Sequence, residues 1–369
     1  MDERESAVAD LKRPSPGFWS GKRVLVLGHT GFKGAWLSLW LRRLGAKVDG
    51  ISLPPEEPSL FAAAGLNKLV GSRYADIREL KPVTEIMQQV RPEIVFHLAA
   101  QSLVRRSYRE PVETYATNVM GTVHVLAAAV AAESVRTAIV VTSDKCYENR
   151  EWLWAYREDE SMGGHDPYSS SKGCAELVAA AWRKSFCGPA KRNLGIASAR
   201  AGNVIGGGDW AEDRLIPDCI RALKAGQAIG IRNPASIRPW QHVLDPLCGY
   251  LILAERLTDK PGTYAEAWNF GPADTDTRPV GWIADRVVSI WGGSARWEKI
   301  PGDALHEANV LKIDASKARQ NLGWSPGLAL DAGIDWTANW YKKVLGGEPA
   351  LAVTEEQIDR YSDLGAAAA

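Results

Sequence analysis

Short apolar runs alternate with helical patterns along the first half of the chain, and this alternation most restricts the fold. The runs are RVLVLG, AKVDGIS, LVGSRYAD, EIVFHLAA, TAIVVTS and LGIASARA. Each is followed by a helix-like segment such as GAWLSLWLRRLG, in which Trp36, Leu37, Trp40, Leu41 and Leu44 recur near helical spacing. Strands that alternate with helices form parallel sheets with crossover helices. The sequence therefore predicts an α/β fold with a doubly wound parallel sheet.

The composition changes after about residue 204, and this change predicts a second domain. Gly, Pro, Trp and Arg become dense in GNVIGGGDWAEDRLIPD and IRNPASIRPWQHVLDP, and the regular alternation ends. With 369 residues the chain is long enough for two domains. We expect a sheet domain over residues 18–204, to which some later segments return, and a smaller mixed α/β lobe for the substrate over 205–350. Residues 1–17 and 351–369 are expected to be extensions.

The overall charge excludes some partners. Lys plus Arg and Asp plus Glu both number 44, so no bulk charge attracts nucleic acid or an anionic membrane. There is no run of about 18 apolar residues, and MDERESAVAD lacks the apolar core of a signal peptide. We expect a cytoplasmic protein that binds neither nucleic acid nor membrane. Its five scattered cysteines contain no C-x-x-C pair, so neither a disulfide framework nor a metal site is expected.

A glycine motif follows the first strand pattern. Gly28, Gly31 and Gly34 have G-x-x-G-x-x-G spacing in VLVLGHTGFKGAW. Glycines there allow a tight turn and let backbone N–H groups approach a pyrophosphate at a helix N-terminus. The motif alone is weak, but its place inside a βαβ pattern favours a Rossmann dinucleotide site over an ordinary glycine loop. The residues expected to line this site are Gly28, Thr30, Gly31, Phe32, Gly34, Leu98, Ala99 and Ala100.

The ends of the second and third strand patterns are expected near the adenosine of the cofactor. An acidic residue about 20 positions after the motif usually binds the ribose. Asp49 satisfies the count but lies inside the strand pattern, and Ser52 is nearer its end. A serine repels a 2′-phosphate less than a carboxylate does, so this position leaves NAD and NADP open. Asp76 and Ile77 are expected at the adenine, with strand-end capping as the alternative.

The stretch DPYSSSKGCAELVAAAW predicts a helix capped by Asp166. Tyr168 and Lys172 are four residues apart and so share one helical face. A nearby cation is expected to lower the pKa of the phenol and make it a base for a sugar hydroxyl. A surface Tyr/Lys pair is the alternative, because Y-x-x-x-K alone is a weak signal.

Several blocks together resemble a known family. In chain order they are the glycine motif, HLAAQSLVRRSY, NVMGT, TSDKCY and Y-x-x-x-K. They resemble the extended short-chain dehydrogenase/reductase superfamily, specifically its nucleotide-sugar 4,6-dehydratases, over about residues 18–345. The resemblance implies NAD as cofactor and a nucleotide sugar as substrate. GHTGFKGAWL, TSDKCYEN, GNVIGGGDWAEDRLIPD and RPWQHVLDP are most similar to the members that act on CDP-glucose, and cell-surface deoxysugar formation is the pathway implied.

The resemblance also implies the roles of Ser143, Asp144 and Lys145, where a strand pattern ends in an acid beside a base. Tyr168 would take the C4 hydroxyl proton, oriented by Ser143, while hydride passes to NAD. Asp144 would protonate the leaving C6 hydroxyl, and Lys145 would remove the C5 proton. These roles need a protonated Asp144 and a neutral Lys145. The family usually has Glu in place of Lys145, and a solvated Asp/Lys pair with a strand-end serine is the alternative.

The remaining candidates surround these groups. Asn118 in NVMGT matches a structural asparagine of the family that holds the geometry of the active-site strands beside the cofactor, with capping of its own helix as the alternative. Arg214 and Arg238 are expected at the substrate diphosphate, because guanidinium groups suit phosphate oxygens. Asn203 would add an amide donor, and Gln101 is expected at the substrate.

Two other functions remain open. A 4-epimerase or decarboxylase on the same fold would share Tyr168 and Lys172 but would have no use for Asp144 and Lys145; a dehydratase for another nucleotide sugar would use all four. A non-catalytic dinucleotide sensor often loses the tyrosine or lysine. The resemblance further implies a homodimer or homotetramer, formed through a four-helix bundle that includes the Tyr168 helix. AAAVAA near residue 127 and ELVAAAW near 176 offer small-residue faces, which could also pack on their own sheet.

Overall fold

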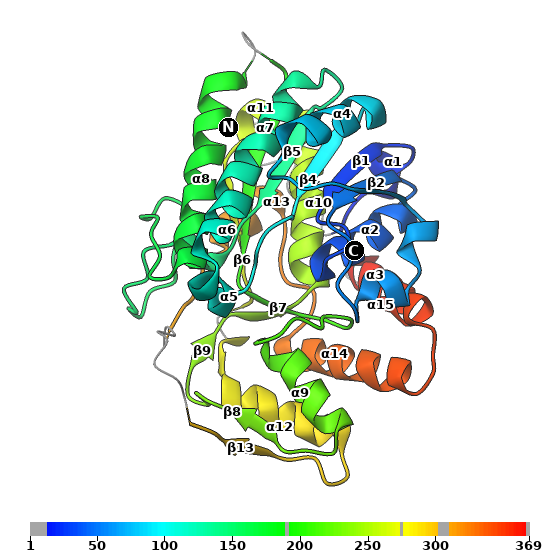
Figure 1. The fold of residues 1–369 in the computed structure, drawn as a ribbon, viewed down its shortest axis with the longest axis vertical. Helices are drawn as coiled ribbons and strands as arrows, with labels where there is room; N and C mark the ends of the chain where they lie inside the picture. The colour runs from blue at the N-terminus through cyan, green and yellow to red at the C-terminus, as the bar shows by residue number, and fades with distance from the viewer. Residues whose placement is uncertain (1–12, 189–191, 274–275, 302–309, 367–369) are drawn as a thin grey trace.

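The computed structural model describes residues 13–188, 192–273, 276–301 and 310–366 (Figure 1). The first twelve residues of the predicted leader and the last three of the tail lie outside the described residues. A seven-stranded sheet has the order β11-β6-β5-β4-β1-β2-β3, and every pair in it is parallel. The predicted doubly wound sheet is confirmed. Its strands are β1 (Arg23–Leu27), β2 (Lys47–Ser52), β3 (Gly71–Tyr74), β4 (Ile94–His97), β5 (Thr137–Val141), β6 (Gly195–Ala201) and β11 (Ala267–Phe270).

Helices cover both faces of the sheet, which explains why β4 and β5 are buried along their whole length and are mostly apolar. Along β1, Leu25 and Leu27 pack into a cluster with α4 (Leu80–Val90), α7 (Gly121–Ala131) and α8 (Pro167–Phe186). Val24 and Val26 point to the other face, into the cluster with α2 (Phe32–Arg43) and α10 (Leu244–Asp259).

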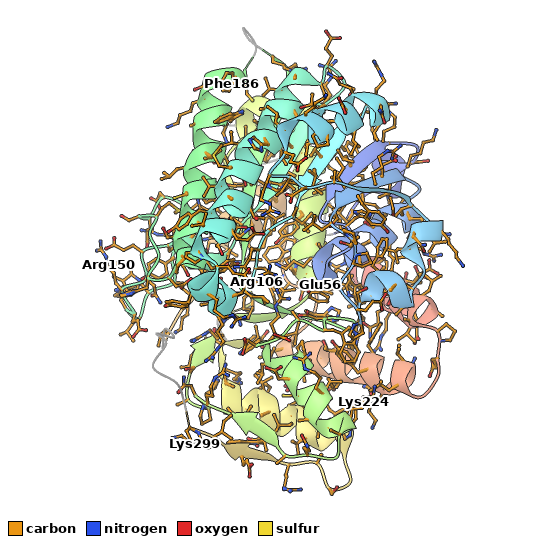
Figure 2. All side chains as sticks on the ribbon, in the orientation of Figure 1. Glu56, Arg106, Arg150, Phe186, Lys224 and Lys299 are labelled. Carbon is orange, nitrogen blue, oxygen red and sulfur yellow. The ribbon has the colours of Figure 1, made fainter. Side chains whose placement is uncertain are left out.

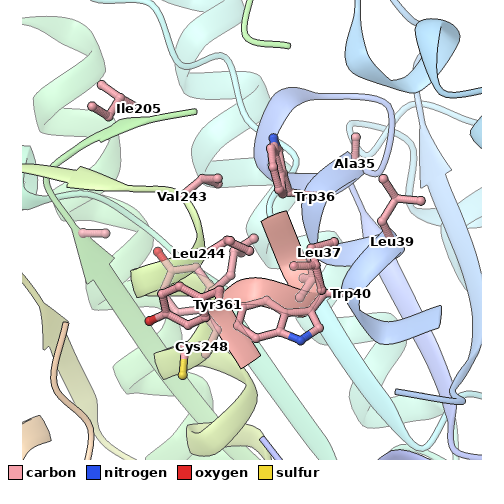
Figure 3. Packing of buried hydrophobic residues seen from close by; sticks show 14 of the residues in the cluster. Ala35, Trp36, Leu37, Leu39, Trp40, Ile205, Val243, Leu244, Cys248 and Tyr361 are labelled. Atoms are coloured by element: carbon pink, nitrogen blue, oxygen red, sulfur yellow. The ribbon is translucent and has the colours of Figure 1, made fainter. Parts of the chain in front are cut away.

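The C-terminal segment is part of this second cluster (Figure 3). Helix α15 (Ala350–Ala366) contacts α2, where Trp40 and Tyr361 meet edge to face with ring centroids 5.5 Å apart. The Tyr361 hydroxyl donates a hydrogen bond to Asp245 Oδ1 on α10 at 2.7 Å. The segment from 351 to 366, expected to be an extension, is therefore a packed helix.

The strand β11 has no counterpart among the predicted runs. It is only four residues long and contains Asn269, a fully buried polar side chain. The Asn269 Nδ2 group donates to the backbone oxygens of Tyr156 (2.9 Å) and Asp314 (3.0 Å), and its Oδ1 accepts from the Tyr147 hydroxyl (2.7 Å). These bonds satisfy the amide, so a polar residue is tolerated inside the sheet.

A smaller mixed lobe lies below the sheet domain in Figure 1. It holds three two-stranded sheets and two helices, and α14 (Leu330–Leu345) lies between the lobe and the sheet domain. The lobe elements are β7 (Asn203–Ile205) with β10 (Trp240–His242), β9 (Ile237–Arg238) with β12 (Arg278–Pro279), β8 (Ile229–Ile231) with β13 (Trp297–Lys299), α9 (Leu215–Lys224) and α12 (Val280–Trp291).

Short helices complete the described chain. They are α1 (Pro16–Trp19), α3 (Leu60–Ala63), η1 (Leu66–Lys68), α5 (Val104–Arg109), α6 (Pro111–Tyr115), η2 (Ala116–Met120), η3 (Asp144–Cys146), α11 (Pro261–Tyr264) and α13 (Ser316–Leu322). Within the part of the chain that the structure describes, no helix combines the length and apolar character needed to cross a membrane.

Candidate active site

A cavity of about 1030 Å³ lies where the carboxyl ends of the sheet strands face the smaller lobe. Ligands of open α/β sheets bind at this edge. Glu56 and Arg106 line the cavity near the boundary of the two parts (Figure 2), with 4.0 Å between Oε1 and Nη1. The predicted site residues that line it are Gly28, Thr30, Gly31, Phe32, Gly34, Ser52, Asp76, Ile77, Leu98, Ala99, Ala100, Gln101, Ser143, Asp144, Lys145, Tyr168, Lys172, Asn203, Arg214 and Arg238.

The glycine loop has the geometry of a pyrophosphate site. Gly28 has φ +89°, and a Cβ there would lie 2.7 Å from the Ala99 nitrogen. A Cβ on Gly34 would collide with the Gly28 carbonyl oxygen. Helix α2 begins directly after Gly31, with no side-chain cap on its first N–H groups. These groups and the helix dipole favour an anion at this point.

At the adenosine end, Ser52 and Thr30 are joined by a hydrogen bond of 2.6 Å between their hydroxyl oxygens. Asp49 forms an ion pair with Arg73. Asp76 accepts hydrogen bonds from the Arg78 backbone N–H (2.9 Å) and from Arg78 Nε (2.8 Å), and these lower the pKa of its carboxyl. The Asp76 carboxylate thus acts as a cap on its own turn while it also lines the cavity.

Asn118 does not line the cavity. It lies in η2, and its side-chain hydrogen bonds reach two neighbouring segments. Its Oδ1 accepts from the Gln101 N–H (2.9 Å), and its Nδ2 donates to the Gln101 oxygen (2.9 Å) and the Ser171 hydroxyl (2.8 Å). It therefore holds the segment after β4 against α8. These bonds fit the structural role that the resemblance implies, and helix capping does not account for them.

Asp144 is the most unusual group of the site. It begins η3, just beyond the end of β5, and is only 2% exposed. Its Oδ1 accepts a hydrogen bond from the Ser143 hydroxyl at 3.0 Å, whereas its buried Oδ2 has no partner among the described residues. Burial raises the pKa of the carboxyl, and the charge of Lys145 opposes this. A buried carboxyl with a free oxygen is suited to donate a proton.

Tyr168 and Lys172 lie on the cavity side of α8. The Asp166 carboxylate caps the helix by accepting from the Ser169 N–H at 2.9 Å, as the sequence predicts. Burial raises the pKa of Tyr168 to about 12, against a hydrogen bond with Ser143. The predicted lowering of this pKa is wrong here, because burial outweighs every favourable neighbour. Lys172 instead donates to the Val141 oxygen at 3.4 Å, and burial lowers its pKa to about 8.

Glu176 lies on α8, four residues after Lys172, and was not predicted from the sequence. It is buried in the next turn of α8, where Ser198 (2.7 Å) and Arg200 (2.8 Å) donate hydrogen bonds to it, as does Thr142. These bonds join α8 to β6 and to the residue before Ser143. Its charge favours the protonated form of Lys172. The signal was present in the sequence, because Glu176 continues the four-residue spacing of Tyr168 and Lys172.

The residues predicted on the substrate side differ in how far their polar groups are already hydrogen-bonded within the protein. Arg214 donates to Asp209 (2.8 Å) and Ser102 (2.9 Å), and Arg238 donates to the Ile237 oxygen (2.9 Å). Asn203 begins β7 and lines the cavity, and no described residue forms a hydrogen bond with its side chain. The Gln101 amide bonds to Leu103 in its own loop and to Thr114 on α6, so it shapes the cavity wall. Across the described ranges no group of three potential ligands is arranged to hold a metal ion.

The second missed residue is Lys33, which lies between Phe32 and Gly34 in the glycine motif and lines the cavity. Its electrostatic neighbours are Arg214, Lys172, Asp144 and Asp209. The signal was a charged residue between Phe32 and Gly34, at the start of the helix that follows the glycine turn.

The fold, glycine loop and Tyr168/Lys172 helix define a member of the extended short-chain dehydrogenase/reductase superfamily. The chain belongs to the NAD dependent epimerase/dehydratase family, whose profile matches residues 24–271. It is 52% identical over 348 residues to a CDP-glucose 4,6-dehydratase of Salmonella typhimurium strain LT2, covering 93% of this chain and 97% of that one. Its cofactor is NAD, and the uncapped helix and glycine cradle fit it.

Solved structures agree on the fold. A dTDP-glucose 4,6-dehydratase from Bacillus anthracis in complex with NAD has a TM-score of 0.73 at 19% identity, covering 90% of this chain and 100% of that chain. A UDP-glucose 4-epimerase from Thermotoga maritima with UDP-glucose has a TM-score of 0.74 at 23% identity, covering 87% and 99%. The same fold therefore carries both reactions, and only the site distinguishes them.

Gly34→Ala is expected to weaken NAD binding. The added Cβ would overlap the Gly28 carbonyl and force the loop to shift, so we expect Kd for NAD to rise by about 10-fold or more. Calorimetric titration with NAD measures this. Gly262→Ala is the matched control, because a Cβ there meets nothing within 4 Å. An unchanged Kd in Gly34→Ala would refute the pyrophosphate site.

Proposed function

We propose that this protein catalyses the NAD-dependent 4,6-dehydration of CDP-glucose to CDP-4-dehydro-6-deoxyglucose. One observation carries the proposal: the buried carboxyl of Asp144, with its unpartnered Oδ2, lies beside Lys145 in the cavity that Tyr168 lines. An epimerase needs no second acid and base there, whereas elimination of water needs both. The relative that is 52% identical carries the name of this activity.

The first step removes two hydrogens from C4 of the hexose. NAD, when bound, accepts the hydride from C4 and later returns it at C6. Tyr168 first releases its own proton to solvent in the cavity, and the resulting phenolate takes the hydroxyl proton; the Ser143 hydrogen bond favours that ionised form. Lys172, with a pKa of about 8, carries most of its positive charge below pH 8. We assign it the role of favouring the phenolate, because it lies four residues from Tyr168 on the same helical face.

The second step eliminates water across C5 and C6. The C4 ketone acidifies the C5 hydrogen, and Lys145 takes that proton. Asp144 donates a proton to the C6 oxygen, which leaves as water. The raised pKa of Asp144 favours the protonated form that this step consumes. Hydride return to C6 and protonation at C5 then complete a reaction without net oxidation.

A substrate panel tests the activity. Incubation of the protein and NAD with CDP-, UDP-, dTDP- and GDP-glucose should convert only CDP-glucose, with a product lighter by one water. Mass spectrometry of the nucleotide sugars measures this, and heat-inactivated protein is the control. Conversion without mass change, giving the C4 epimer, would instead support the epimerase. No conversion of any of the four would contradict the proposal.

We also propose that the protein forms a homodimer or homotetramer through α7 and α8. These helices lie side by side at one edge of the molecule (Figure 1) and contact each other. Leu177 on α8 is 61% exposed, and Val112 on the neighbouring α6 is 81% exposed. Exposed apolar side chains on adjoining helices are typical of an association surface.

Leu177→Glu is expected to shift this assembly toward monomer, because a carboxylate would be buried at the contact. Light scattering coupled to gel filtration measures the mass. Leu345→Glu on α14, where the wild-type side chain is 39% exposed, is the control and should leave the mass unchanged. A monomeric wild-type protein would rule the proposed assembly out.

A further inference from the structure

Lys33 is a cation that no acceptor in the protein engages. Its side chain is half-buried and lines the cavity from the first turn of α2. Among the described residues, none forms a hydrogen bond or an ion pair with its Nζ. A lysine withdrawn from water without a partner is costly, so such residues usually serve a ligand.

The charges around Lys33 come from three other elements. Lys172 faces it from α8 and Arg214 from the N-cap of α9, and both are positive. Asp209 is also near, and its carboxylate pairs with Arg214 at 2.8 Å, so these two charges offset each other and the ammonium groups of Lys33 and Lys172 remain. Asp144 in η3 is the remaining neighbour, and burial favours its uncharged form. The balance at this point of the cavity is therefore positive, which suits an anion.

We propose that Lys33 is a diphosphate-binding residue, whose ammonium pairs with phosphate oxygens of a nucleotide in the cavity. This inference rests on the proposed function, in which the cavity holds two diphosphates. The pyrophosphate of NAD would lie on the backbone of the same loop, and the diphosphate of the nucleotide sugar would lie by Arg214. The charged neighbours of Lys33 belong to the catalytic and substrate side, which favours the diphosphate of the sugar.

The charge state of Lys33 gives a second consequence. Burial, with repulsion by Arg214 and Lys172, lowers its pKa to about 7, and Asp144 and Asp209 oppose this. Above pH 7 most of the free protein therefore carries a neutral Lys33. A bound diphosphate raises the pKa again, so binding at pH 8 takes up a proton.

Calorimetric titrations of Lys33→Met and Lys33→Arg with CDP and, separately, with NAD test the proposal. Loss of a charge-assisted hydrogen bond should weaken binding of CDP by roughly 10- to 100-fold in Lys33→Met. Lys33→Arg should retain most of the affinity. Lys81→Met removes an exposed lysine at the start of α4 and is the matched control, expected to bind both ligands as the wild type does.

The two titrations identify the source of the diphosphate. A loss confined to NAD would assign Lys33 to the cofactor and keep the diphosphate role. Affinities within about twofold of wild type for both ligands would overturn the proposal. A wild-type protein that binds neither CDP nor NAD would instead contradict the proposed function itself. Thermal unfolding of each variant confirms that a loss is not one of folding.

The proton is measured by repeating the CDP titration at pH 8 in HEPES and in Tris, which differ in ionisation enthalpy. The wild type should take up more protons per CDP than Lys33→Met, because Asp144, Asp209, Lys172 and Arg214 remain in both. Equal uptake would show that no ammonium forms at Lys33 and would overturn the proposal.

Discussion

Burial of ionisable side chains at the carboxyl end of β5 is the constraint on which the whole site depends. It raises the pKa of Asp144 and of Tyr168, and it lowers that of Lys172. In water at neutral pH, Asp144 would be a carboxylate, Tyr168 a phenol and Lys172 an ammonium. The acid needed to protonate the leaving hydroxyl would then be absent. The segment directly after β6 supplies part of the enclosure: a Cβ on Gly202 would lie 3.2 Å from Asp144 Oδ2.

An ionised pair behind the catalytic groups, Glu176 on α8 and Arg200 on β6, holds α8 against the sheet. Glu176 remains a carboxylate, because Arg200, Ser198 and Thr142 hold its pKa low against burial. The pair of Glu176 and Arg200 is enclosed by α8 and β6, where removal of one partner would leave an unpaired buried charge. Glu176 therefore keeps the charge that joins α8 to β6, whereas burial favours the uncharged form of Asp144, which must donate a proton. This ionised pair adjoins the catalytic groups, because Thr142, which donates to Glu176, directly precedes Ser143.

Local patterns predict much of the fold and the members of the site, but not its electrostatics. Six strands follow from apolar runs. Strand β11 was not predicted, because Asn269 interrupts its apolar run and the hydrogen-bond partners of that amide are distant in the chain. The cavity gathers the predicted residues except Asn118, since parallel strands bring their carboxyl ends to one edge. The phenol pKa was predicted with the wrong sign, because spacing places a lysine on the same face without showing that burial dominates. Lys33 was missed for a similar reason: its charged neighbours come from three segments far away in the chain.

The central claim is that Asp144 is the acid and Lys145 the base of one elimination. Deuterium incorporation at C5 of CDP-glucose, measured by mass spectrometry and NMR after incubation in D2O with NAD, tests it most directly. Asp144→Asn should return substrate labelled at C5 without water loss, because the base still acts while the leaving group lacks its proton. Lys145→Ala should show neither label nor water loss. Water loss at the wild-type rate in Asp144→Asn, or label at C5 in Lys145→Ala, would contradict this account.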